Sequence, residues 1–193
     1  MQLARSTEVS TREDLSVLCN RRYSDSHAQY IRLAVEIGVH CAAFTVPFLS
    51  KWSGRMLYAI DPWQSDLPDY TDILNEKGRD RSADMMLALC ALSRFNGRVT
   101  PLRAKSDQAA GWIPNDLEFV YIDGNHMRNY QYADMKAYWK KLRHNGILAG
   151  HDLDGSWKDE TMWALEKFTT ENHIQVVNFI PNVEAASWYV IKS

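Results

Sequence analysis

Acids and imidazoles follow two apolar runs near the middle of the chain. Residues 119–122 precede Asp123 and His126, and residues 147–149 precede His151 and Asp152. In a parallel α/β sheet, ligands bind beyond the carboxyl ends of the strands, so neighbouring strands would bring these four side chains into one crevice. Carboxylates and imidazoles in a crevice can move protons or bind a metal ion. The pattern therefore predicts an active site.

Each of these residues also has a structural interpretation. A buried histidine is commonly satisfied by hydrogen bonds alone, and an aspartate after a strand often caps the next helix. Four such groups at the ends of two runs favour a functional site over independent structural roles.

The elements that must position these groups alternate along the chain. Apolar runs typical of strands occupy residues 33–37, 56–60, 98–102, 119–122, 147–149, 174–180 and 187–191. Segments of helical periodicity lie between them, at residues 42–50, 83–95, 128–143 and 157–170. This alternation predicts an α/β fold with a mostly parallel sheet.

Two details narrow the topology. Pro101 lies in the third strand and cannot donate a hydrogen bond to a neighbour, which predicts an edge strand. Only residues 181–186 join the last two strands, whereas a parallel crossover needs about a dozen residues or more. We therefore expect an antiparallel hairpin at the end of the chain.

Composition limits the class of protein. The 193 residues are 46% hydrophobic and 24% charged, which predicts one domain over residues 1–193, with residues 1–30 as a helical lead-in or a lid. A net charge of −2 provides no basic field for nucleic acid or an anionic membrane, so we expect a small-molecule substrate. Three scattered cysteines and the lack of an apolar run near ~20 residues predict a cytoplasmic protein.

Several motifs occur in a characteristic order. They are residues 35–39 (VEIGV), 58–63 (YAIDPW), 121–126 (YIDGNH), Asp134 with Trp139, residues 146–152 (GILAGHD) and 187–191 (SWYVI). In these motifs the chain resembles class I S-adenosylmethionine-dependent methyltransferases, particularly the small group related to catechol, macrolide and sugar O-methyltransferases. The resemblance implies a doubly wound, seven-stranded, Rossmann-like sheet of order 3-2-1-4-5-7-6, with strand 7 antiparallel and helices on both faces.

The resemblance implies a cofactor half on the early strands. Gly38 permits close approach of the cofactor, and a carboxylate at Asp61 can accept both ribose hydroxyls. The full set implied for S-adenosylmethionine is Glu36, Gly38, Asp61, Ser106 and Asp107. In one departure, Ala42 stands where the family usually has a second glycine, which removes the freedom of positive φ.

The resemblance also implies an acceptor half at the later strand ends. His126 matches the family position of a general base, and the resemblance implies that it acts together with Asp123. Metal-dependent relatives bind Mg²⁺ through acids at the positions of Asp123, His151 and Asp152. His151 replaces an acid found in many relatives, and imidazole favours Mn²⁺, Fe²⁺ or Zn²⁺. Its role stays open between metal ligand, base and substrate contact.

The expected activity is O-methylation of a small hydroxylated metabolite or sugar, assisted by a divalent cation. The acceptor and the oligomeric state, including a homo-oligomer, stay open. One alternative is a metal-dependent phosphoesterase, for which Asp25 and His27 fit the required Asp-x-His spacing without a preceding strand. A nicotinamide-dependent oxidoreductase would need a Gly-x-Gly-x-x-Gly turn that the first strand lacks. A protein that binds S-adenosylmethionine without catalysis is a third alternative.

Overall fold

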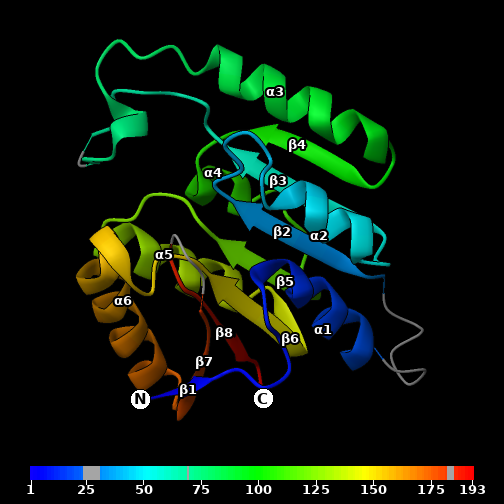
Figure 1. The fold of residues 1–193 in the computed structure, drawn as a ribbon, viewed down its shortest axis with the longest axis vertical. Helices are drawn as coiled ribbons and strands as arrows, with labels where there is room; N and C mark the ends of the chain where they lie inside the picture. The colour runs from blue at the N-terminus through cyan, green and yellow to red at the C-terminus, as the bar shows by residue number, and fades with distance from the viewer. Residues whose placement is uncertain (24–30, 69, 182–184) are drawn as a thin grey trace.

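The computed structural model describes residues 1–23, 31–68, 70–181 and 185–193. Over these residues, eight strands form one sheet of order β1-β7-β8-β6-β5-β2-β3-β4 (Figure 1). The strands are β1 (Gln2–Arg5), β2 (Leu33–Ile37), β3 (Met56–Asp61), β4 (Val99–Arg103), β5 (Leu117–Ile122), β6 (Leu142–Gly150), β7 (Val176–Ile180) and β8 (Ser187–Ile191).

The predicted order of seven strands is confirmed. β2 lies between β3 and β5, all of the pairs from β4 to β6 are parallel, and β8 runs antiparallel to both β6 and β7. β4, which contains Pro101, is at one edge of the sheet, as proline requires. The carboxyl ends of β2, β3, β5 and β6 therefore meet at one end of the sheet.

The prediction for the amino-terminal segment is partly wrong. Gln2–Arg5 is strand β1, which pairs in parallel with β7 and forms the other edge of the sheet. This strand is mostly exposed, so it lacks the alternation of apolar residues that identifies a strand in a sequence. Among residues 1–23, helical structure is confined to residues 12–22, in the 3₁₀ turn η1 (Arg12–Asp14) and in α1 (Leu15–Arg22).

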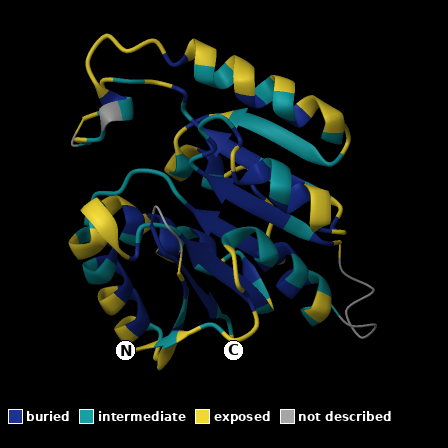
Figure 2. Cartoon of the chain, viewed as in Figure 1, coloured by how far each residue is buried: buried dark blue, intermediate teal, exposed yellow. Residues whose placement is uncertain are grey.

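Helices cover both faces of the sheet. α1, α2 (Thr45–Lys51) and α3 (Ser82–Leu92) pack on one face, and α4 (Ser106–Ala110), α5 (Arg128–Trp139) and α6 (Lys158–Glu171) pack on the other. Along β2, Ala34 belongs to the first hydrophobic cluster, whereas Val35 and Ile37 belong to the second, as the period of two in a strand requires. Figure 2 shows the central strands buried between the two layers. The described part of the chain also contains the short 3₁₀ turns η3 (Ile73–Asn75), η4 (Ser93–Phe95) and η5 (Gly155–Trp157).

One helix ends earlier than predicted. α5 ends at Trp139, and Leu142, which continues its helical spacing, is instead the first residue of β6 and pairs with Leu117. Leu142 is buried in the hydrophobic cluster below α5. The spacing of apolar residues alone does not distinguish a further helical turn from the start of a strand at this position.

The segment 21–27 was expected to be part of a lid. Tyr23 lies with its ring 4.3 Å from the Arg32 guanidinium, just before β2, and Arg22 contacts Asn145 in β6. These contacts place residues 22 and 23 at the opposite end of the sheet from Asp123. The rest of that segment, with Asp25 and His27, lies outside the described residues. Among the helices that the structure describes, none combines the length and apolar character of a membrane span.

Candidate active site

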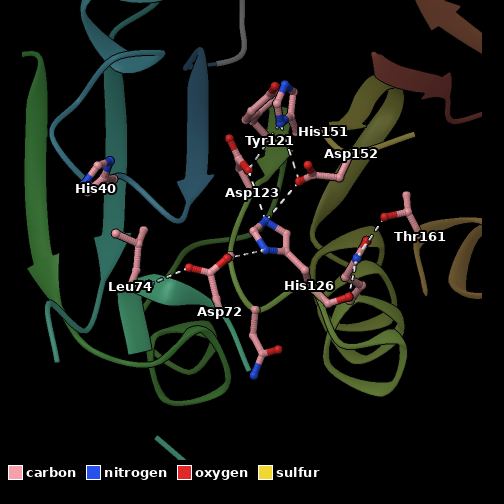
Figure 3. Close-up of polar contacts among 12 residues, drawn as sticks. His40, Asp72, Leu74, Tyr121, Asp123, His126, His151, Asp152 and Thr161 are labelled. Atoms are coloured by element: carbon pink, nitrogen blue, oxygen red, sulfur yellow. Dashed lines mark hydrogen bonds and ion pairs between the residues drawn. The ribbon is translucent and has the colours of Figure 1, made fainter. Parts of the chain in front are cut away.

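The four predicted side chains meet at the ends of β5 and β6. Ile122 pairs with Gly150, so Asp123 and His151 leave the sheet side by side. His126 Nε2 lies 3.0 Å from Asp152 Oδ2 and 3.5 Å from Asp123 Oδ1. His151 Nδ1 lies 3.5 Å from Asp152 Oδ2 and 3.8 Å from Asp123 Oδ1 (Figure 3). The parallel pairing of β5 and β6 therefore brings the whole cluster together.

The other ring nitrogen of His126 faces the loop between β3 and α3. His126 Nδ1 lies 3.6 Å from Asp72 Oδ2 and 3.4 Å from the Tyr70 hydroxyl. Asp72 is itself held, because its Oδ1 accepts the Leu74 N–H at 2.7 Å. The Trp157 ring lies 5.2 Å from the His126 ring, in a stacked arrangement. The imidazole is thus fixed by an acid on one side and an aromatic ring on one face.

The charges in this cluster shift one another's pKa values. Burial alone lowers the pKa of His126, but Asp123, Asp152 and Asp72 outweigh it and raise that pKa to about 11. Burial alone raises the pKa of Asp152, but His126 and His151 hold it well below its usual value. Three carboxylates and two imidazoles therefore form a site that attracts positive charge.

A cation from the amino-terminal segment also reaches this cluster. Arg12, in η1, has its Nη1 atom 3.9 Å from Asp123 Oδ2, and its side chain is 16% exposed. The pairing of β1 with β7 leads the chain across the sheet to this position. The amino-terminal segment thus contributes a side chain to the cluster at the ends of β5 and β6.

The donor set in this cluster suits a divalent cation. Asp123, His126 and Asp152 offer ligand atoms that all lie within 4.8 Å of one another. His126 Nε2 and His151 Nδ1 are the nitrogens that face these two carboxylates. Imidazole nitrogens gathered beside carboxylates are a donor set that a divalent metal ion accepts. The group differs from the predicted ligand set in that it contains His126, although His151 borders both acids.

Gly38 follows β2 and packs closely against the backbone just after β5. Its φ is +87°, and a Cβ atom added there would lie 1.8 Å from the Asp123 carbonyl oxygen. Only glycine tolerates both this backbone conformation and this contact. Gly38 therefore sets how closely the β2 loop approaches the acid at the end of β5.

Asp61 ends β3 in a buried position beside the same loop. Its Oδ2 accepts the His40 N–H at 2.9 Å, and its Oδ1 accepts the Trp63 N–H at 2.7 Å. Burial raises the pKa of Asp61, and the two backbone donors oppose that shift. These donors fix the plane of the carboxylate, while each oxygen keeps a further lone pair for a ligand.

A cavity of about 520 Å³ connects these groups, which is within the range of small-molecule sites. Of the predicted residues, it is lined by Gly38, Asp61, Ser106, Asp107, Asp123 and His126. Glu36 is not among the described residues that line it: the side chain is 1% exposed and Oε2 has no hydrogen bond. Burial raises the pKa of Glu36 well above its usual value.

Some residues near the cavity have strained backbone angles. Positive φ angles occur at His40 (50°), Ala42 (65°), Trp63 (41°) and Asp152 (59°), in the segments that follow β2, β3 and β6. Others occur at a distance from it, at Asp116, Asn145 and His173, so this strain does not by itself mark the site.

Sequence analysis missed Asp72 and Arg12. Asp72 lies in the loop after β3, where neither periodicity nor a motif distinguishes it from the other acids at positions 66, 69 and 80. Arg12 lies in a segment whose pairing with β7 is the unpredicted feature of the sheet. Neither residue could be found without knowing which distant parts of the chain lie next to each other, namely the loop of Asp72 beside His126 and β1 beside β7.

Comparisons with solved structures support the fold. An O-methyltransferase from Bacillus cereus in complex with SAH superposes with a TM-score of 0.63 at 14% identity, covering 98% of this chain and 84% of that one. A Streptococcus mutans protein in complex with SAH gives 0.65 at 15% identity, covering 96% and 99%. An rRNA methylase from Streptococcus thermophilus gives 0.61 at 11% identity, covering 92% and 93%.

Sequence comparison identifies the family. No curated protein sequence matches the chain. A family model described as a methyltransferase domain matches residues 35–153, which run from within β2 to beyond β6 and include the residues that line the cavity. The match spans more than half of the 193 residues. The chain therefore belongs to this methyltransferase family and has the class I methyltransferase fold.

Proposed function

We propose that this protein transfers a methyl group from S-adenosylmethionine to a hydroxyl of a small metabolite or sugar, with a divalent cation assisting. One observation carries the proposal: a single cavity is lined by Gly38 and Asp61 on one side and by Asp123 and His126 on the other. A methyl donor bound on the first side would present its sulfonium to an acceptor on the second. The SAH-bound structures with the same fold support the choice of cofactor.

The cofactor half uses the early strands. Asp61 accepts the two ribose hydroxyls, and its backbone donors keep the carboxylate in plane for this contact. Ser106 and Asp107, at the start of α4, line the cavity beyond Asp61 and contact the adenine ring. Gly38 leaves room for the amino-acid end of the cofactor.

The chemistry is an in-line displacement. The acceptor oxygen forms a bond to the methyl carbon, the carbon–sulfur bond breaks, and its electron pair stays on sulfur to give S-adenosylhomocysteine. A cation held beside Asp123 and Asp152 would offset the carboxylates that raise the pKa of His126 to about 11, and the neutral imidazole takes the acceptor proton on Nε2. Asp72, beside Nδ1, orients the ring and stabilises the imidazolium that forms, so His126 is the base and Asp72 the positioning residue.

The acids beside His126 suit a divalent cation. Asp123, His151 and Asp152 would hold it, because His151 Nδ1 lies beside the two carboxylates and imidazole with carboxylate is a donor set that Mn²⁺, Fe²⁺ or Zn²⁺ accept. When bound, such an ion lowers the pKa of the acceptor hydroxyl and orients it.

Ring faces near His126 support a small acceptor. Tyr70 and Trp157 lie 6.1 and 5.2 Å from the imidazole, between ring centroids. Aromatic faces of this kind pack against sugars and phenols. The net charge of −2 gives little attraction for a polyanionic acceptor.

Methyl-labelled S-adenosylmethionine, incubated with the protein and a cell extract, tests this function. We expect label in the small-molecule fraction, and His126→Ala should reduce it at least about 100-fold while keeping cofactor affinity. His151→Ala should instead weaken Mn²⁺ binding. Asp159→Asn, on the exposed side of α6, is the matched control. Label found only in protein or RNA would overturn the small-acceptor proposal, and full turnover by His126→Ala would remove the base.

A further inference from the structure

A second cluster of metal-binding side chains lies on the other side of the cofactor loop. His40 and Cys41, in the loop between β2 and α2, face Asp84 in the first turn of α3. Cys41 Sγ lies 3.8 Å from Asp84 Oδ1, and His40 Nε2 lies 3.7 Å from Asp84 Oδ2. Ligand atoms from all three residues lie within 4.8 Å of one another. The methyl-transfer chemistry uses none of these side chains.

The spacing of the three donors is close to that of a zinc site. Bonds of ~2.3 Å to sulfur and ~2.1 Å to nitrogen or oxygen, at tetrahedral angles, give donor–donor separations of about 3.4–3.6 Å. The Cys41 sulfur is a few tenths of an ångström beyond this value from Asp84 Oδ1, and His40 Nε2 is equally close to the second oxygen, Oδ2, of the same carboxylate. An ion can therefore enter with small side-chain movements.

Asp84 is held for this role by a neighbouring cation. Arg81 Nε donates to Asp84 Oδ2 at 2.5 Å, and Arg81 is itself buried. This contact fixes the carboxylate and leaves Oδ1, beside the Cys41 sulfur, for a metal. Outer contacts of this type orient metal-binding carboxylates in known sites.

We propose that His40, Cys41 and Asp84 form a binding site for a thiophilic divalent cation, for which Zn²⁺ is the best fit. Thiolate, imidazole and carboxylate together select Zn²⁺ over Mg²⁺ or Ca²⁺, which prefer all-oxygen sites. Cys41 binds as the thiolate, and its proton leaves to solvent. The His40 side chain is 45% exposed, so water completes the tetrahedron from the open side.

The site connects to the cofactor half of the cavity. The His40 N–H donates to Asp61 Oδ2, and the His40 carbonyl accepts the Trp63 Nε1–H at 2.8 Å. An ion that ties His40 and Cys41 to α3 therefore holds the loop in the conformation that orients Asp61. Zinc at this site cross-links the β2–α2 loop to α3, and the site is separate from that of the cation beside Asp123.

Cobalt substitution tests the site directly. Co²⁺ added to the metal-free full-length protein should produce a thiolate-to-cobalt charge-transfer band in the near ultraviolet. The cluster beside Asp123 contains no sulfur, so Co²⁺ bound there cannot produce this band. Cys41→Ser should abolish the band and weaken Zn²⁺ binding at least about 10-fold, the loss expected for even an outer contact. Cys90→Ser, which removes an exposed cysteine in α3, should leave both unchanged.

A second measurement avoids any folding defect in the Cys41 variant. In Cys90→Ser, Cys41 is the accessible thiol, because Cys19 is buried. One equivalent of Zn²⁺ should slow alkylation of this thiol at least about 10-fold, Mg²⁺ should not, and Asp84→Asn should reduce the protection. Cobalt binding without a thiolate band, or equal alkylation rates with and without Zn²⁺, would overturn the proposal.

Discussion

His126 lies among three carboxylates that come from three separate parts of the chain. Asp123 and Asp152 follow strands β5 and β6, and their positions could be predicted, since parallel strands that end in acids bring those acids together. Asp72 could not be predicted, because it lies in a loop whose path depends on tertiary contacts. The sequence thus identified Asp123 and Asp152, which face Nε2 of His126, and missed Asp72, which faces Nδ1.

Asp72→Asn should separate positioning from binding. The new amide would keep an oxygen for the Leu74 N–H but turn its NH₂ toward His126 Nδ1, which favours the tautomer with its proton on Nε2. We expect kcat to fall at least about 10-fold, with a shifted pH profile, because general-base catalysis contributes ~10²–10⁴-fold. Steady-state kinetics should show little change in KM for S-adenosylmethionine. A variant with the parental kcat would exclude Asp72 from the mechanism.

Gly38→Ala should be among the most damaging small substitutions. Its new Cβ would overlap the Asp123 carbonyl oxygen, 1.8 Å away, so the ends of β2 and β5 must separate. We expect a loss of at least about 2–3 kcal/mol in the free energy of unfolding, measured by urea denaturation. Gly111→Ala is the matched control, since its nearest neighbour would lie at 3.7 Å. Equal stability of the two variants would contradict this account of Gly38.

At the scale of elements, the β2–α2 loop shows where a family position has changed. The resemblance indicates a glycine at position 42, and the alanine found there has a φ of 65°. Its N–H donates to the Val39 carbonyl at 2.7 Å, which maintains the turn despite the strain. The motif could therefore predict the place of the loop, whereas the strain could be seen only in the backbone angles.

Ala42→Gly should change stability little, although it deletes a buried methyl group. Relief of a left-handed alanine, ~1–2 kcal/mol, offsets the added entropy of the unfolded chain, ~0.4–1 kcal/mol, and the lost burial of one methyl, ~0.8 kcal/mol. Thermal unfolding should therefore show a change of less than about 1 kcal/mol. Ala43→Gly is a reference for the entropy term alone, because Ala43 is exposed and is not among the residues with positive φ. If Ala42→Gly loses as much stability as the entropy and the methyl group together, Ala42 is not strained.

Strand order could be predicted more fully than element ends. Pro101 and the short connection at 181–186 placed β4 at an edge and made β8 antiparallel, because each imposes a backbone constraint independent of context. β1 was missed because its burial is too slight to leave a pattern. The end of α5 was missed because Leu142 is buried in either conformation.

At the scale of the whole molecule, one buried acid should affect the pH dependence of stability. Burial raises the pKa of Asp134, on α5, from 3.8 to about 7, although the Ser106 hydroxyl opposes the shift. Between these values the folded state binds more protons than the unfolded state, so stability falls as pH rises from about 4 to about 7. The loss should reach roughly 4 kcal/mol at pH 8.

Urea denaturation of Asp134→Asn between pH 4 and pH 8 checks this effect. The amide cannot ionise, so the stability of the variant should lack this part of the pH dependence. Its free energy of unfolding should therefore increase relative to that of the parent as pH rises. Asp159→Asn, which is exposed, should follow the parent. If the free energy of unfolding changes with pH in the same way in the parent and in Asp134→Asn, the pKa of Asp134 is not raised in the folded protein.

The central claim is that the cavity holds a methyl donor between Asp61 and Asp123. Calorimetric titration with S-adenosylmethionine, in the parent, Asp61→Asn and Asp159→Asn, tests it most directly. We predict one cofactor per chain, an affinity about 10- to 100-fold weaker in Asp61→Asn, since hydrogen bonds to charged groups contribute ~1.5–3 kcal/mol, and parental affinity in Asp159→Asn. No binding at millimolar cofactor, or an affinity that Asp61→Asn leaves unchanged, would contradict the claim.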